Sequence, residues 1–175
     1  EHPMSIMQVE GARECCIEFN SMSKSHNMPG WRVGMCIANP TFTSWILKIK
    51  SNVDSGIFCG IQLAAAAALN GNTPEWHREA NITTYRRRRH KAERMMTTLG
   101  CTYDPQQVGM FLWGRIPDKY ADVEQLTERV LHEAKVFITP GFIFGNNGRR
   151  YIRISLCAKD EKMQEALHRV EALQW

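Results

Sequence analysis

The sequence predicts an α/β fold in which a compact α+β unit forms the carboxyl-terminal part. Near the beginning, short apolar and β-branched segments are bounded by Gly, Ser, Asn or Pro, as strands are. A helical pattern then fills residues 41–99. After residue 100 strand-like and helix-like segments alternate, which is typical of an α+β unit.

The first two elements are predicted to be strands joined by a short connection. Residues 16–20 and 32–38 carry the strand pattern, and the connection holds Lys24 among small and hydroxylated residues. We therefore expect Lys24 on the connection, where the backbone on both sides is fixed by strand pairing.

The middle of the chain is predicted to form two long helices. The first covers residues 41–69, with Thr43 as a plausible N-cap and with Gly56 and Gly60 permitting a bend. The second begins at Pro74, which suits a first helical position, and ends near Leu99. The α+β unit that follows is predicted to contain strands and helices at residues 108–116 (strand), 123–134 (helix), 136–139 (strand), 151–156 (strand) and 159–173 (helix).

Composition sets the broad class of protein. The chain has 175 residues, of which 43% are hydrophobic and 23% charged, as in ordinary globular proteins. No apolar run reaches the roughly 20 residues that span a bilayer, so no membrane segment is expected. The six cysteines show no Cys-x-x-Cys spacing, so we expect no metal site and a reducing compartment, the cytoplasm. Because the chain starts Glu-His-Pro-Met and enters a strand almost at once, we expect it to be the later part of something longer.

Lys24 is a candidate for covalent chemistry. A lysine that attacks a carbonyl must be fixed in place and partly deprotonated, which burial beside cations favours. The hydroxyls of Ser21 and Ser23 and the guanidinium of Arg32 are the donors that a phosphate dianion requires. Taken alone, a lysine in a serine-rich turn is usually a surface residue, so the joint pattern carries the hypothesis.

That joint pattern resembles a known signature. The stretch SMSKSHNMPGWRVG, residues 21–34, resembles the pyridoxal-phosphate attachment signature of the class I/II aminotransferases, which have the type I fold of pyridoxal-phosphate enzymes. The resemblance implies that Lys24 forms an imine with the aldehyde of pyridoxal 5'-phosphate and later carries a proton, while Ser21, Ser23 and Arg32 hold the phosphate. It also implies amino acid and 2-oxo acid substrates and a homodimer in the full-length parent.

A second block supports the same family. FITPGFIFGNNGRRYIRISL, residues 137–156, looks like the family's Pro-Gly, Phe-Gly and Tyr-x-Arg-x-Ser block, in which the arginine binds the substrate α-carboxylate. That arginine corresponds to Arg153. Arg149 and Arg150 are nearby competitors, but strand alternation puts Arg153 on the same face as Tyr151. A third stretch, residues 108–117, resembles a family strand near the substrate, but we expect its apolar residues to be mainly core, with Met110 or Phe111 the only candidates to touch substrate.

The resemblance covers the later part of the family pattern. It implies that residues 1–42 are the last strands of the large cofactor-binding domain, 43–99 the linking helices, and 100–175 the small carboxyl-terminal α+β domain. The family's other cofactor contacts lie in its earlier half, so we expect the isolated chain to have little or no transaminase activity. Two alternatives stay open, a carbon-sulfur lyase of the same fold and a non-catalytic fragment or binding module.

Two further features compete for a role. The basic run at residues 86–91 could suggest nucleic-acid binding, but four consecutive arginines on a helix point around its whole circumference, so we expect no nucleic-acid partner. His26 could be offered as an acid or base, although we interpret it as a neighbour of Lys24 without a proton-transfer role.

Overall fold

The computed structural model describes residues 4–71 and 73–175. The chain divides into two compact units, Glu1–Pro74 and Glu75–Trp175, each of which is described by itself. The domain boundaries at residues 42 and 99 concern the longer family pattern and stay a prediction.

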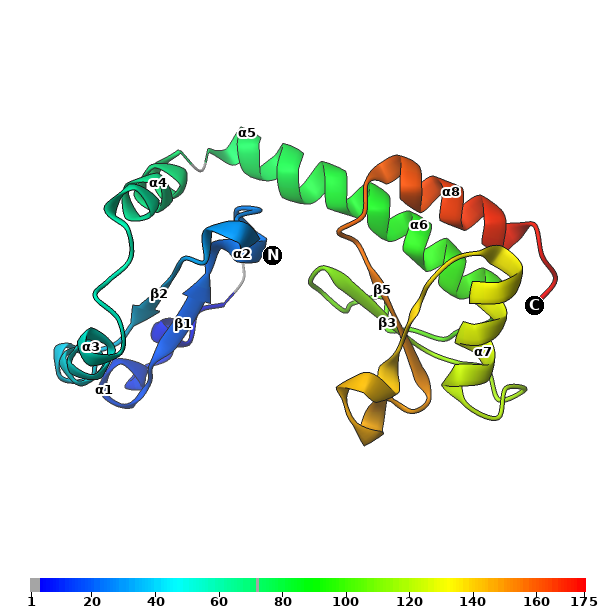
Figure 1. The fold of residues 1–175 in the computed structure, drawn as a ribbon, viewed down its shortest axis with the longest axis horizontal. Coiled ribbons are helices and arrows are strands. Elements are labelled where there is room, and N and C mark those ends of the chain that lie inside the picture. Colours follow the sequence, from blue (N-terminus) through cyan, green and yellow to red (C-terminus); the bar gives the residue numbers. More distant parts are fainter. Residues whose placement is uncertain (1–3, 72) are drawn as a thin grey trace. The chain divides into compact units, whose positions relative to one another are not determined.

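The first unit contains one antiparallel strand pair and two longer helices (Figure 1). Strand pairing aligns Ser21 with Gly34, where an added Cβ would lie 2.5 Å from the carbonyl oxygen of Asn20. Only glycine allows the two backbones to approach this closely. The elements are η1 (Ile6–Gln8), α1 (Ala12–Cys15), β1 (Glu18–Ser21), α2 (Met22–Ser25), η2 (Pro29–Trp31), β2 (Gly34–Ile37), α3 (Pro40–Val53) and α4 (Cys59–Asn70).

The prediction of one long helix over residues 41–69 is wrong. The helix stops at Val53, because Asp54 adopts an extended backbone and its carboxylate accepts hydrogen bonds from the amide of Gly56 and from Lys50. A new helix begins at Cys59. The N-cap was also misplaced, since the side chain of Asn39 accepts the hydrogen bond from the amide of Phe42.

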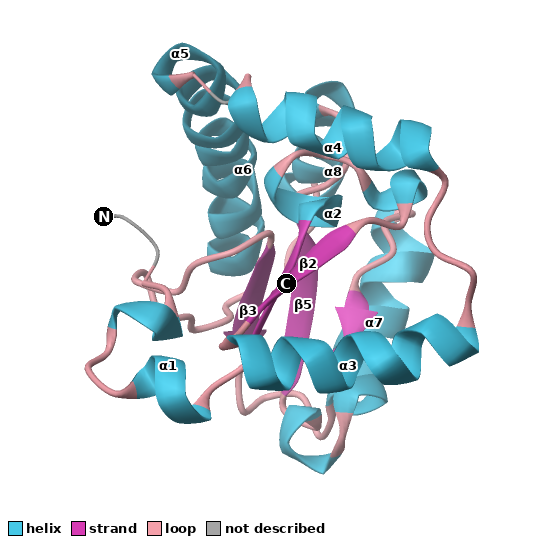
Figure 2. Ribbon diagram, turned by 90° about the vertical axis from the view of Figure 1, so that its left-hand side faces the viewer, coloured by secondary structure: helices cyan, strands magenta, loops and turns pink. Residues whose placement is uncertain are grey.

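The second unit is a three-stranded antiparallel sheet with helices packed on it. The strand order is β3-β5-β4, and β3 and β5 lie side by side (Figure 2). The helices α6 and α8 also run side by side (Figure 1). The elements are α5 (Pro74–His77), the π-helical η3 (Arg78–Thr83), α6 (Thr84–Thr98), β3 (Phe111–Arg115), α7 (Val123–Arg129), the π-helical η4 (Val130–Ala134), β4 (Thr139–Pro140), η5 (Gly141–Phe144), η6 (Asn146–Gly148), β5 (Tyr151–Ser155) and α8 (Asp160–Glu171).

The core of this unit lies on one face of the sheet. Leu112 of β3 and Ile152 and Ile154 of β5 point into it, and Met96 of α6 and Leu167 of α8 are fully buried there. Strand alternation leaves the opposite face of the sheet to the side chains of Phe111, Trp113, Tyr151, Arg153 and Ser155.

The strands and helices predicted after residue 100 are present, and two strands differ most from the predicted bounds. β3 begins at Phe111, and Val108 is 88% exposed. The strand expected at 136–139 consists of Thr139 and Pro140, which pair with Arg153 and Ile152. None of the helices in the parts of the chain that are described is both long and apolar enough to cross a bilayer.

The basic run on α6 is largely occupied by contacts within the unit. Asp160, at the start of α8, forms ion pairs with Lys91 at 2.7 Å and with Arg87 at 3.2 Å. Arg88 donates to the carbonyl of Leu156, and Arg89 donates to the carbonyl of Pro105 at 2.7 Å. These side chains therefore tie α6 to its neighbours.

Candidate functional site

The lysine segment begins where β1 ends. The hydroxyl of Ser21 accepts a hydrogen bond from the amide of Ser23 at 3.2 Å and donates to the Ser23 hydroxyl at 3.0 Å. This cap starts the single helical turn α2, which carries Lys24 as its third residue. The two hydroxyls and the lysine are thus fixed close together by local backbone geometry.

Buried side chains hold this turn in place. Met22 is 1% exposed and packs with Met28, Val33 and Ala65 of α4. The amides of Met28 and His26 both donate to the carbonyl of Met22. Residues on either side of Lys24 are therefore anchored, although Lys24 itself is not buried.

The side chain of Lys24 is exposed, and among residues 4–71 and 73–175 its amine has no hydrogen-bond or ion-pair partner. By contrast, Lys50 on α3 forms an ion pair with Asp54 at 2.7 Å. The burial expected beside the reactive amine is not supplied by the described residues. The amine is available to a ligand.

Arg32 lies at the end of the connection in a left-handed backbone conformation, with φ of 51°. This conformation is uncommon for a residue with a side chain and marks a position held by its surroundings. Its guanidinium donates one hydrogen bond to the carbonyl of Pro29 at 3.1 Å and is otherwise exposed. In the described part of the chain no hydrogen bond joins Arg32 to the two serines.

His26 has a local partner. Its Nδ1 lies 2.9 Å from the hydroxyl of Ser25. The interpretation of His26 as a neighbour of Lys24 without a proton-transfer role stays a prediction.

Arg153 occupies the middle strand of the second unit, opposite Trp113 on β3 and Thr139 on β4. Its guanidinium carbon lies 4.2 Å from the ring centre of Phe111 and 4.1 Å from that of Phe144. Its Nε is buried and has no hydrogen-bond partner among the described residues. An arginine with covered sides and an unpaired donor is suited to bind an anion.

The two competing arginines differ from Arg153. Arg150 donates to the carbonyls of Tyr120, Ala121 and Pro117 and contacts the carboxylate of Asp118, so its guanidinium is used to fix the 117–121 loop. Arg149 is exposed and lines a separate cavity. Strand alternation in the sequence favoured Arg153 over the other two, but the partners of Arg150 could not be predicted from it.

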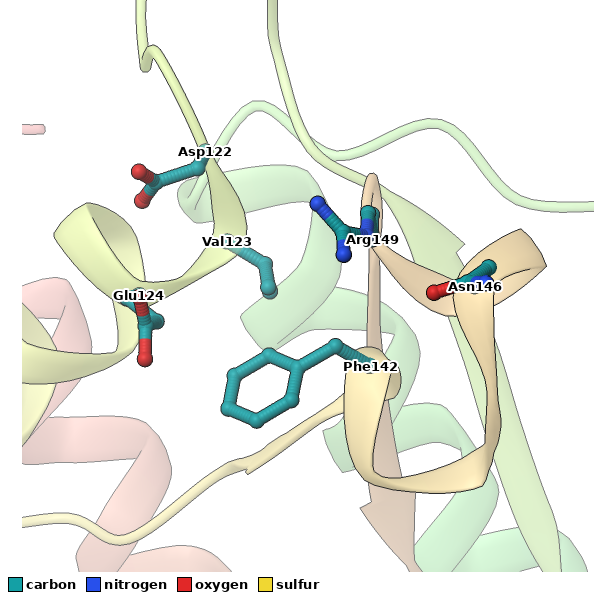
Figure 3. Close-up of a pocket in the computed structure, with 6 residues that line it drawn as sticks. All are labelled: Asp122, Val123, Glu124, Phe142, Asn146 and Arg149. Carbon is teal, nitrogen blue, oxygen red and sulfur yellow. The ribbon is translucent and has the colours of Figure 1, made fainter.

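That cavity has a volume of about 300 Å³ (Figure 3). Figure 3 shows residues 142, 146 and 149 on one side and residues from the start of α7 on the other. Its lining mixes acidic, basic and apolar side chains: Asp122, Val123, Glu124, Phe142, Asn146 and Arg149. Of the residues that line it, the sequence analysis considered only Arg149 for a ligand role, as a competitor of Arg153.

Sequence reasoning also missed the ring contacts of Arg153. Phe111 and Trp113 were expected to be mainly core, but they are only half-buried, while Leu112 between them is buried. The alternation of residues 111–115 was visible, and it separates these two rings from Leu112. What the sequence lacked was the strand register that places them beside Arg153.

Comparison with known proteins gives one consistent family. Residues 2–170 match the family model described as aminotransferase class I and II. An LL-diaminopimelate aminotransferase from Oleidesulfovibrio alaskensis is 39% identical over 98% of this chain, and one from Dehalococcoides mccartyi is 37% identical over 94% of it. The chain spans 43% of the length of the first relative and 42% of the second.

Solved structures similar to this chain come from the same family. The apo structure of BacF from Bacillus subtilis has a TM-score of 0.86 and 31% identity, covering 100% of this chain and 44% of that one. An aromatic aminotransferase from Pyrococcus horikoshii has a TM-score of 0.84 and 30% identity, covering 96% and 45% of the two chains. From the family match and these relatives, the chain belongs to the class I and II aminotransferase family.

Proposed function

We propose that the protein containing these residues is a pyridoxal-phosphate-dependent aminotransferase, which moves an amino group between an amino acid and a 2-oxo acid. The observation that carries the proposal is the exposed amine of Lys24, to which the described residues offer no partner, directly after the paired hydroxyls of Ser21 and Ser23. Family membership agrees with this chemistry, because the relatives are named as aminotransferases.

The donor set fits the cofactor. Two adjacent hydroxyls and an exposed guanidinium match the oxygens of a phosphate, and a free primary amine matches an aldehyde. Ser21, Ser23 and Arg32 would hold the phosphate, and Lys24 would hold the aldehyde end. Pyridoxal phosphate, when bound, supplies an electron sink for the carbon that loses its proton.

The residues of this chain would contribute binding, orientation and proton transfer. Once the amino acid takes the place of Lys24 at the aldehyde, the freed Nζ in its neutral form would accept a proton from the α-carbon and deliver it to the carbon that carried the aldehyde. Arg153 would bind the α-carboxylate through its planar fork and so orient the α-carbon. Relatives named for LL-diaminopimelate make this amino acid the first donor to test.

The proposal also covers the location and the oligomeric state of the protein. A cytoplasmic location is supported by the six cysteines, all of which are free thiols. A homodimer is what the family implies, and α3 has large apolar side chains on its exposed surface, among them Trp45, Leu47 and Ile49.

Covalent capture of the cofactor tests the site. The chain is mixed with pyridoxal phosphate, reduced with borohydride and mapped by mass spectrometry. We expect the label on the peptide containing Lys24 and its loss in Lys24→Arg. The matched control is Lys48→Arg, since Lys48 is an exposed lysine on α3. Labels spread evenly over exposed lysines would remove the proposed role of Lys24.

A further inference from the structure

Two aromatic rings restrict the orientation of the Arg153 guanidinium more than its position on a strand alone would. The rings of Phe111 and Phe144 contact it from two different elements, β3 and η5, at 4.2 Å and 4.1 Å. Cation-π contacts at these distances favour a guanidinium lying over each ring. Arginine otherwise has several freely rotating bonds, and ordering it on binding costs free energy.

The second ring is itself held in place. Trp113 packs edge-on against Phe144, with ring centres 5.3 Å apart. The turn that carries Phe144 starts at Gly141, where an added Cβ would lie 2.6 Å from the carbonyl oxygen of Tyr151 and 3.1 Å from the Trp113 ring. The turn is therefore packed directly against β5 and β3, which fixes where the Phe144 ring can lie.

The polar surroundings of Arg153 point the same way. Its buried Nε has no partner in the described residues, and no ion pair is formed by its guanidinium there. An unpaired buried donor costs free energy in the folded protein unless a ligand satisfies it. Aromatic rings hold the guanidinium without consuming its hydrogen-bond donors, which an acidic side chain would do.

We propose that Phe111 and Phe144 are positioning residues that hold the guanidinium of Arg153 ready for a carboxylate ligand. This inference rests on the proposed role of Arg153 and adds the residues that determine its orientation. The rings act through Arg153 and need not touch the ligand. Pre-organisation of this kind strengthens binding by reducing the ordering cost.

The test follows the Nε–H signal of Arg153 by ¹⁵N-edited NMR in the ¹⁵N-labelled chain. Arg153→Lys identifies the signal by removing it. We expect the proton to lie upfield of the other arginines because of the two rings, and to move on titration with propionate but not with the neutral propionamide. In Phe144→Leu the upfield shift should shrink, and the propionate dissociation constant should rise roughly two- to tenfold.

Two further variants make the test specific. Phe144→Tyr keeps the ring and should restore both the shift and the affinity. Phe137→Leu is the matched control, since Phe137 is 73% exposed and no ring contact of its side chain appears among the described residues. Phe111→Leu gives an independent second measurement if Phe144→Leu does not fold.

The outcomes separate this inference from the proposed function. An Arg153 signal and propionate affinity unchanged in both leucine variants would overturn the positioning role. A signal in the wild-type chain that ignores propionate would overturn it as well. Trapping of pyridoxal phosphate on Lys24 is measured in the same samples, and it reports on the proposed function alone.

Discussion

Substitution by methionine is expected to destabilise the protein at Arg150 and to abolish carboxylate binding at Arg153. Arg150→Met removes hydrogen bonds to three backbone carbonyls and the contact with Asp118, the shortest being 2.6 Å to Tyr120. One hydrogen bond from a charged donor contributes about 1.5–3 kcal/mol net, and several from one group are not additive. The side chain of Arg150 is 30% exposed, so water replaces part of what is lost. We expect a loss of about 2 kcal/mol in the free energy of unfolding.

Arg153→Met should change stability far less. The substitution removes two cation-π contacts of about 0.5–1 kcal/mol each. It also removes the buried Nε, which has no partner within residues 4–71 and 73–175 and whose desolvation costs about 1–3 kcal/mol. Methionine packs well against aromatic rings, so it fills most of the space that the arginine side chain leaves. The lost cation-π contacts and the relieved desolvation nearly cancel, so we expect the free energy of unfolding to change by no more than about 1 kcal/mol.

The assay is urea unfolding followed by circular dichroism on the wild-type chain and both variants. For a domain of about 100 residues, which is about the size of the second unit, each 1 kcal/mol also shifts the melting temperature by roughly 4–8 °C, so thermal unfolding gives a second measurement. Propionate affinity should be retained in Arg150→Met and lost in Arg153→Met. Greater destabilisation by Arg153→Met than by Arg150→Met would refute the division into a structural and a ligand-binding arginine.

Three other predictions follow from contacts of the second unit. Gly141→Ala should destabilise by about 1–3 kcal/mol, because its Cβ would meet two backbone carbonyls that cannot move aside, and it should broaden the Arg153 Nε–H signal; an unchanged urea midpoint would contradict this. Lys91 and Arg87 hold the pKa of Asp160 below its ordinary value. The Asp160 carboxylate therefore stabilises the folded chain at pH values above the ordinary pKa, and this stabilisation is lost as the pH falls through the lowered pKa. Asp160→Asn should therefore lower the melting temperature more at pH 7 than at pH 2, whereas equal losses at both pH values would exclude this electrostatic origin. Burial raises the pKa of the Cys101 thiol to about 12, so iodoacetamide at pH 8 should label exposed cysteines and spare Cys101 until the chain unfolds; rapid native labelling of Cys101 would be inconsistent with its burial.

The local features of the lysine segment could be predicted from the sequence. Small and turn-forming residues bounded the strands, and a serine before a short helical turn is a common cap. The positions of Ser21, Ser23 and Lys24 in the structure follow from these local preferences. The long helix over 41–69 was mispredicted because apolar residues kept a helical spacing through a break that Asp54 and Gly56 create by hydrogen bonding.

The environment of Arg153 could not be predicted in the same way. Trp113 lies opposite Arg153 through strand register, and Phe144 reaches it through a turn packed against the sheet. The partners of Arg150 are about thirty residues away in the chain. Such contacts depend on tertiary packing, and residue patterns within one segment do not contain them.

The central claim is that Lys24 belongs to an aminotransferase. The most direct test uses a fusion protein in which these 175 residues are joined to the part of the O. alaskensis relative that they do not cover. With pyridoxal phosphate present, the transfer of ¹⁵N from a labelled amino donor to 2-oxoglutarate is measured. We expect ¹⁵N-glutamate from the joined protein and none above background from its Lys24→Arg variant. Release of labelled ammonia without ¹⁵N-glutamate, or equal transfer by the variant, would contradict it.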